Sequence, residues 1–222
     1  MDNNKWLNDD VIKKFDEFLN ERELPDSQGD ILVMLGAPGS GKGTLSKQLN
    51  EKFGINHIST GDLIRKSDDP DLKKIIEEGK FISDDMMLKM LRKELKKLDL
   101  NKGIIFDGYP RTIKQARKLD SLLGKLGLGL NHAIFMDLPE EKAKERIRNR
   151  AKKEGRKDDA SDEVIDKRFA EYNEKTYPLV DFYKKSRKLI KIDADLGMEG
   201  VLKAIIKKLG LKEPKGKKDE KI

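Results

Sequence analysis

Nine residues in the first quarter of the chain have the types and spacing that bind phosphate. They run from Gly36 to Thr44 and read GAPGSGKGT. Glycines let the backbone wrap closely around an anion, so several N–H groups can point at it, and a following helix adds partial positive charge at its N-terminus. Lys42 would then reach the outer groups of a bound polyphosphate. The pattern predicts a phosphate-binding loop.

The neighbours of this loop support the same interpretation. The apolar run Ile31–Leu35 precedes it, and Leu45, Leu49 and Phe53 recur behind it at helical spacing. A strand, a loop and a helix in this order is the context that a phosphate loop needs. The alternative, a glycine-rich turn without chemistry, does not account for this context. One departure is that Gly43 separates the lysine from the threonine, so the usual magnesium-binding hydroxyl is displaced by one place.

Two polar segments begin where later apolar runs end. His57–Arg65 reads HISTGDLIR, and Phe106–Thr112 reads FDGYPRT. Ligands of parallel sheets bind at the carboxyl ends of strands, and an Arg can bind phosphate through two hydrogen bonds. Asp107, at the end of a buried run, has the usual placement of a carboxylate that holds magnesium through water. Alone, the first segment would be a capped helix start, and Asp-Gly would be a turn.

A basic segment extends from Arg146 to Arg168. Arg146 and Arg150 lie one turn apart on a predicted helix face, and the stretch GRKDD follows at 155–159. Taken alone, such a run is more typical of a solvated helix or a nucleic-acid-binding patch.

Together these motifs resemble the nucleoside monophosphate kinases, and among them the adenylate kinase family in its short-lid form most closely. The resemblance covers about residues 30 to 210. It implies that Asp107 holds magnesium, through water. It implies that ATP is bound by Pro38, Gly39, Ser40, Gly41, Lys42, Gly43, Thr44 and Arg146. It implies that the catalytic residues are Lys42, Arg150, Arg156 and Arg168.

The resemblance also implies a site for AMP. Arg65 and Arg111 would bind its phosphate, and the amide of Gln115 would read adenine, because it can donate and accept one hydrogen bond each. The segment Gly79–Asp84 would border the base, although by itself it is better explained as a connection between helices. The implied AMP-binding residues are Thr60, Gly61, Arg65, Phe81, Ile82, Gly108, Arg111 and Gln115.

The expected reaction is the reversible, magnesium-dependent transfer of the ATP γ-phosphoryl group to AMP, giving two ADP. Phosphoryl transfer needs in-line positioning and charge neutralisation rather than a protein nucleophile. His57 and His132 are therefore expected to be structural. The acceptor segment 60–88 and the lid 150–162 are expected to close over the substrates. The lid lacks the long insertion that sometimes bears zinc, so we expect no zinc.

Three other functions fit parts of the sequence. A kinase of UMP or CMP shares the motifs, although Gln115 favours adenine. A P-loop regulator or RNA-associated ATPase would use the basic surface, and would show slow hydrolysis and salt-dependent nucleic-acid binding. A scaffold that binds a partner through its N-terminal helix would show no turnover.

Five short apolar runs, separated by amphipathic stretches, predict the elements that position these residues. They predict an α/β fold: a three-layer P-loop sandwich with a five-stranded parallel sheet, a helical monophosphate-binding segment and a short lid. The runs are Ile31–Leu35, Asn56–Ser59, Gly103–Phe106, Ala133–Leu138 and Leu189–Ile192. Residues 29–211 would form this domain, preceded by an amphipathic helical extension at 1–28 and followed by a charged tail at 212–222.

The composition of the chain further narrows the classes of protein to which it could belong. The 222 residues include 48 Lys and Arg against 41 Asp and Glu, but the two signs are interleaved, which fits solvated helices better than a nucleic-acid stripe. There is no cysteine, which excludes disulfides and cysteine metal sites. No run of about 18 apolar residues occurs, and acidic residues near the N-terminus argue against a targeting segment. We expect a cytoplasmic monomer whose partners are ATP, AMP and ADP, without nucleic acid or membrane.

Overall fold

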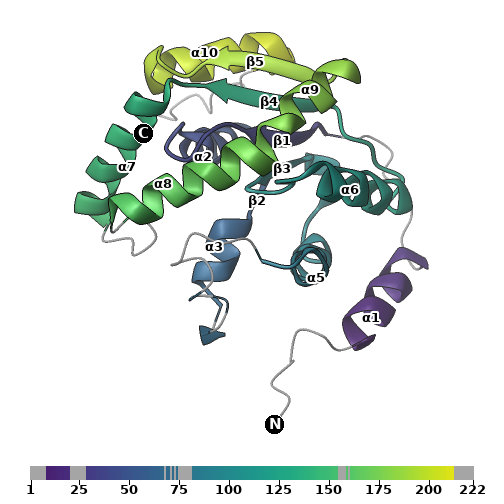
Figure 1. Cartoon of the computed structure of the whole chain (residues 1–222). Helices are drawn as coiled ribbons and strands as arrows, with labels where there is room; N and C mark the ends of the chain where they lie inside the picture. The colour runs from purple at the N-terminus through teal and green to yellow at the C-terminus, as the bar shows by residue number, and fades with distance from the viewer. Residues whose placement is uncertain are drawn as a thin grey trace, which may run out of the picture.

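A five-stranded, all-parallel sheet lies at the centre of the computed structural model, in the order β2-β3-β1-β4-β5 (Figure 1). The strands are β1 (Ile31–Leu35), β2 (Asn56–Ser59), β3 (Ile104–Asp107), β4 (His132–Asp137) and β5 (Leu189–Asp193). The predicted α/β fold is therefore confirmed, with strand ends that differ from the expected ones by one residue at most. The structure describes residues 9–20, 29–67, 69–70, 72, 74, 82–154, 159 and 161–212.

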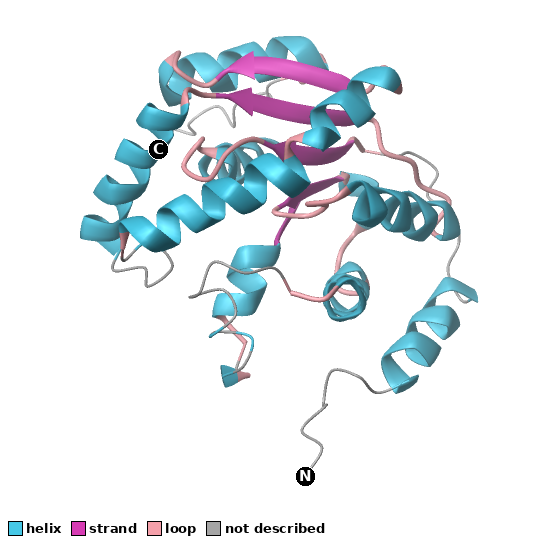
Figure 2. Ribbon diagram, viewed as in Figure 1, coloured by secondary structure: helices cyan, strands magenta, loops and turns pink. Residues whose placement is uncertain are grey.

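Helices cover both faces of this sheet, as Figure 2 shows. They are α1 (Asp9–Asn20), α2 (Lys42–Phe53), α3 (Thr60–Arg65), α5 (Asp84–Leu95), α6 (Ile113–Lys125), α7 (Glu140–Glu154), α8 (Asp162–Glu171), α9 (Pro178–Lys185) and α10 (Gly197–Leu209). Two short turns add the 3₁₀-helix η1 (Leu100–Lys102) and the π-helical η3 (Tyr172–Thr176). Among the described residues, no helix is long and apolar enough to cross a membrane.

Successive side chains of the central strand β1 point to opposite faces of the sheet, and the core is therefore divided into two layers. Ile31, Val33 and Leu35 pack into a cluster with α5, α6 and α9, whereas Leu32 and Met34 pack into a second cluster with α2, α7 and α10. All five side chains are buried, so the strand is apolar on both faces, as expected for a parallel sheet covered by helices.

The register of the strands brings their carboxyl ends to one edge. Asp107 of β3 is paired with Met34 of β1 on one side and with Ser59 of β2 on the other. The chain leaves β1 into the glycine-rich loop and leaves β2 into α3. The polar segments that the sequence singled out therefore start beside one another, at the position where ligands bind in such sheets.

The N-terminal helix α1 packs against α5 at the periphery (Figure 1). Phe15 is 1% exposed, and the guanidinium of Arg92 in α5 lies 5.8 Å from the centre of its ring. Phe18 and Leu19 pack on the same cluster. The remaining parts of the predicted extension, 1–8 and 21–28, and residues 213–222 of the predicted tail lie outside the described residues.

Replacing Phe15 with Ala should lower the free energy of unfolding by about 3–5 kcal/mol, because the truncation leaves a cavity between α1 and the core. Urea unfolding of the whole chain measures this change. Glu17→Ala, at an exposed position of the same helix, is the control and should unfold like the original protein. Equal stability of the Phe15 variant would show that α1 contributes nothing to the fold.

Candidate active site

The glycine-rich loop leaves the start of α2 open to an anion. Gly41 precedes the helix with φ 96° and ψ 9°, in the left-handed region, and no side chain caps the helix there. The first N–H groups of a helix lack partners within the helix, so they can bind phosphate. Gly39 has φ 81°, and a Cβ at this position would lie 2.3 Å from the Ala143 carbonyl oxygen of α7. Only glycine therefore lets the loop pass this close to α7.

Lys42 is held inside the loop by its own carbonyls. Its Nζ donates to the carbonyl oxygens of Gly36 and Ala37 at 2.8 Å each, and to Ser40 Oγ at 3.3 Å. These three acceptors use the three hydrogens of the ammonium group. The bonds shape the loop and place the positive charge at its centre.

The surroundings of Lys42 make its proton easier to lose. Burial is the largest cause, and it lowers the pKa of Lys42 from 10.5 to about 8. The carboxylate of Asp107 acts in the opposite direction, whereas the positive charges of Arg111, Arg168 and Arg150 lower the pKa further. A bound polyanion would raise the pKa of Lys42 again, because its negative charge favours the protonated ammonium group.

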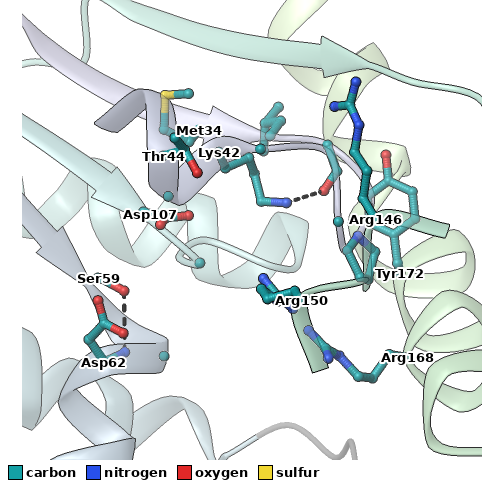
Figure 3. Close-up of a pocket in the computed structure, with 18 of the residues that line it drawn as sticks. Met34, Lys42, Thr44, Ser59, Asp62, Asp107, Arg146, Arg150, Arg168 and Tyr172 are labelled. Carbon is teal, nitrogen blue, oxygen red and sulfur yellow. Dashed lines mark hydrogen bonds between the residues drawn. The ribbon is translucent and has the colours of Figure 1, made fainter. Parts of the chain in front are cut away.

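A cavity of about 750 Å³ opens in front of the loop. Figure 3 shows Lys42, Asp107, Arg150 and Arg168 around it. Among the described residues, eight cationic side chains line it: Lys42, Lys47, Arg65, Arg111, Arg146, Arg150, Lys153 and Arg168. Among the same described residues, the acids that line the cavity are Asp62 and Asp107. This excess of positive charge suits a ligand with several phosphates.

Asp107 lies at the end of β3, across from the start of α2. A Cβ at Gly43 would be 3.2 Å from its Oδ2 atom, so the glycine makes room for the carboxylate. His57 Nε2 is 3.6 Å from the same oxygen. Thr44, which is exposed and lines the cavity, adds a hydroxyl oxygen nearby. Carboxylate and hydroxyl oxygens are hard donors that suit magnesium.

A magnesium ion here would take most of its ligands from elsewhere. Within the described part of the chain, no three His, Cys, Asp or Glu side chains gather in a way that could hold a metal. Magnesium usually keeps several waters and binds one or two carboxylates together with substrate phosphates. The pair of Asp107 and Thr44 fits this kind of site.

Two arginines line the side of the cavity that faces β2 and β3. Arg65 Nη2 donates to Asp62 Oδ1 at 2.6 Å within α3, and Arg111 Nε donates to the Gly108 carbonyl oxygen at 2.9 Å. Burial raises the pKa of Asp62, but the bond and charge of Arg65 outweigh it and hold that pKa below its ordinary value. Thr176 Oγ1 of η3 donates to the Arg111 carbonyl oxygen at 3.0 Å. Both guanidinium groups are therefore anchored beside the cavity.

A buried carboxylate holds two further arginines together. Asp159, whose side chain is fully buried, accepts two hydrogen bonds from Arg150, at 2.7 and 2.9 Å, and one from Arg168, at 2.5 Å. Burial raises the pKa of Asp159, but the two arginines hold it below its ordinary value. In the sequence Asp159 is only one acid within a basic segment, and an acid inside a run of bases is the signal that could have identified it.

One face of α7 borders the other side of the cavity. Arg146, Asn149, Arg150 and Lys153 all line it, at positions that helical spacing places on one face. Arg146 Nη2 donates to the Ala194 carbonyl oxygen at 3.0 Å, after β5. The same spacing could have identified Asn149 and Lys153 from the sequence, whereas Met198 of α10, which also lines the cavity, carried no such signal.

Most of the predicted site residues surround this one cavity. Those that line it are Pro38, Gly39, Gly41, Lys42, Gly43, Thr44, Gly61, Arg65, Asp107, Gly108, Arg111, Arg146, Arg150 and Arg168. Four others are buried and do not line it: Ser40, Thr60, Ile82 and Gln115. Thr60 donates to the Asp107 carbonyl oxygen at 3.3 Å. Phe81 and Arg156 lie outside the described residues.

Comparison with known proteins agrees with this geometry. The family model described as "Adenylate kinase" matches residues 34–188. A protein named "Adenylate kinase" from Xanthomonas euvesicatoria pv. vesicatoria (strain 85-10) is 44% identical over 185 residues, which cover 81% of this chain and 98% of that protein. One of the same name from Stenotrophomonas maltophilia (strain R551-3) is 44% identical over 168 residues, which cover 73% and 89%. The predicted resemblance is confirmed: the chain belongs to the adenylate kinase family.

Proposed function

We propose that this chain catalyses the reversible, magnesium-dependent transfer of the ATP γ-phosphoryl group to AMP, giving two ADP. The proposal rests on the convergence of eight cationic side chains, counted in the described part of the chain, on one cavity between an uncapped helix start and two anchored arginines. Membership of the family makes the chain a phosphotransferase. Nothing in the comparisons favours a UMP or CMP kinase, a P-loop regulator or a scaffold.

The donor occupies the loop and the face of α7. The backbone N–H groups of the loop, from Pro38 to Thr44, hold the ATP phosphates, and Arg146 lies along the nucleotide on the side of Met198. Lys42 exchanges one of its loop carbonyls for a phosphate oxygen and follows the transferred group. Asp107 and Thr44 are the residues that would hold a magnesium ion, Asp107 through water. Bound there, magnesium would supply neutralisation of phosphate charge.

The acceptor occupies the side of the cavity that faces β2 and β3. Arg65 and Arg111 hold the phosphate of AMP, and the backbone at Gly61 and Gly108 lies beside it. The base extends toward Thr60 and Ile82, and the Gln115 amide reads its edge. Phe81 is assigned to the base only through the family resemblance. An acceptor phosphate oxygen is already ionised, so the transfer needs no general base.

The transferring group lies between these two sites. Arg150 and Arg168, together with Arg156, spread the charge that develops on it, and Asp159 sets the spacing of the first two. Closure of the segments 60–88 and 150–162 keeps out water, which would otherwise compete as the acceptor. The expectation of a cytoplasmic monomer that binds neither nucleic acid nor membrane stays a prediction.

A coupled assay of ADP formation from ATP and each nucleoside monophosphate tests the function, with AMP expected to be the fastest acceptor. Lys42→Ala should lower turnover by at least about 10³-fold, because the transition state loses its central charge. Lys52→Ala, near the other end of α2, is the matched control and should keep its activity. Faster turnover with UMP or CMP, or hydrolysis of ATP that needs no acceptor, would contradict the proposal.

The lowered pKa of Lys42 predicts a limit at alkaline pH. In the free enzyme the ammonium loses its proton as the pH rises through about 8, so kcat/KM for MgATP should fall above that value. Bound phosphates favour the charged form, so kcat should stay level to higher pH. In Lys42→Arg the guanidinium stays charged, and the alkaline fall of kcat/KM should disappear. A kcat/KM profile that is flat to about two pH units above this pKa would contradict this account.

Asp159→Asn tests the link between the two lid arginines. Without the charge that joins them, Arg150 and Arg168 repel each other, and kcat should fall by about 10²-fold with a smaller change in KM. Steady-state kinetics measure the two parameters separately. Asp162→Asn, which removes a largely exposed carboxylate paired with Arg148, is the control and should have little effect. Equal effects of the two variants would show that Asp159 has no special role.

A further inference from the structure

Gln115 is held at every polar atom. Its backbone N–H donates to Thr112 Oγ1 at 3.1 Å, and its carbonyl oxygen accepts from the Tyr109 hydroxyl at 3.2 Å. The residue is 4% exposed. These bonds hold the backbone at the start of α6 in place, so the side-chain amide is the part of Gln115 that can face a ligand.

The two ends of that amide have different partners. Oε1 accepts from the backbone N–H of Arg111 at 2.7 Å, and Nε2 donates to Asp84 Oδ1 at 2.9 Å. A backbone N–H can only donate, and an ionised carboxylate can only accept. Turning the amide over would place its NH₂ group against the N–H and its oxygen against the carboxylate. The orientation is therefore dictated by the chemistry of the two partners.

An amide held in this way keeps one hydrogen on Nε2 and one lone pair on Oε1 for a ligand. Adenine presents an amino group that donates at C6 and a nitrogen that accepts at N1. Hypoxanthine and guanine present the reverse order, an oxygen at C6 and an N–H at N1. We propose that Asp84 is a specificity-determining residue, which holds the Gln115 amide in the orientation that pairs with adenine and rejects 6-oxopurines. This inference rests on the proposed function, in which Gln115 reads the base of AMP.

Asp84 is well placed for this task. It is the first residue of α5, after Ser83, whose side chain accepts a hydrogen bond from the Met86 N–H. Its second oxygen, Oδ2, lies 3.6 Å from Lys114 Nζ and 3.7 Å from Lys118 Nζ. One carboxylate oxygen thus accepts a hydrogen bond from the amide, and the other faces two cations. These partners hold the carboxylate of Asp84 in its orientation.

The test compares AMP with IMP, whose hypoxanthine has nearly the size of adenine and the reverse hydrogen-bonding order. In Asp84→Asn the new amide can offer either its oxygen or its NH₂ group, so one of the two partners that fix the Gln115 amide is lost and only the Arg111 N–H still favours the original orientation. The ratio of kcat/KM for AMP to that for IMP should fall by about tenfold or more, the effect of one mismatched buried pair. Asp84→Ala removes the acceptor and should shift the ratio in the same direction.

Asp85→Asn is the matched control. Asp85 is the next residue of α5 and also pairs with Lys118, at 3.0 Å, so this variant loses the same charge from the same turn without touching Gln115. Its ratio should match that of the original enzyme. Melting curves of all three variants establish that each is folded. An unchanged ratio in both Asp84 variants would overturn the inference alone, whereas failure of the original enzyme to form ADP from AMP would overturn the proposed function as well.

Discussion

Repulsion between like charges is the constraint on which the arrangement of the cavity depends. Within the residues that the structure describes, eight cationic side chains line one cavity, and the fold must keep them apart. Asp62 holds Arg65, Asp159 holds Arg150 and Arg168, and loop carbonyls hold Lys42. These four cations are thereby held in place before any phosphate arrives, so little has to reorganise around them during the reaction.

The sheet brings these separate anchors to one place. The loop after β1, the helix after β2 and Asp107 at the end of β3 come from three neighbouring strands. Because the strands are parallel, their carboxyl ends coincide, and groups distant in sequence meet without long connections. The lid side is anchored differently: Thr176 of the π-helical turn η3 bonds to the carbonyl oxygen of Arg111, which ties the helix bearing Arg168 to the acceptor side.

Features encoded locally could be predicted from the sequence. Glycine spacing around Lys42, and apolar runs that end in Ser59 or Asp107, depend on residues a few places apart, and both the strands and the residues around the cavity followed from them. Pairs made by tertiary contact could not be predicted. Asp84 and Gln115 are 31 residues apart, and no periodicity links an acid at one helix start with an amide at another. Thr60 is buried and does not line the cavity, and this position likewise depends on how α3 packs, which the sequence does not show.

The docking of α1 on α5 also has a consequence for the order in which the protein is made. The helix α1 precedes the matched family region, which begins at residue 34, and it leaves the ribosome before α5. Its partner α5 is finished roughly 75 residues later, which at 5–20 residues per second takes about 4–15 s. During that interval the apolar stripe around Phe15 has no α5 to cover it. The extension is therefore exposed to chaperones, or to another nascent copy, before it can join its own core.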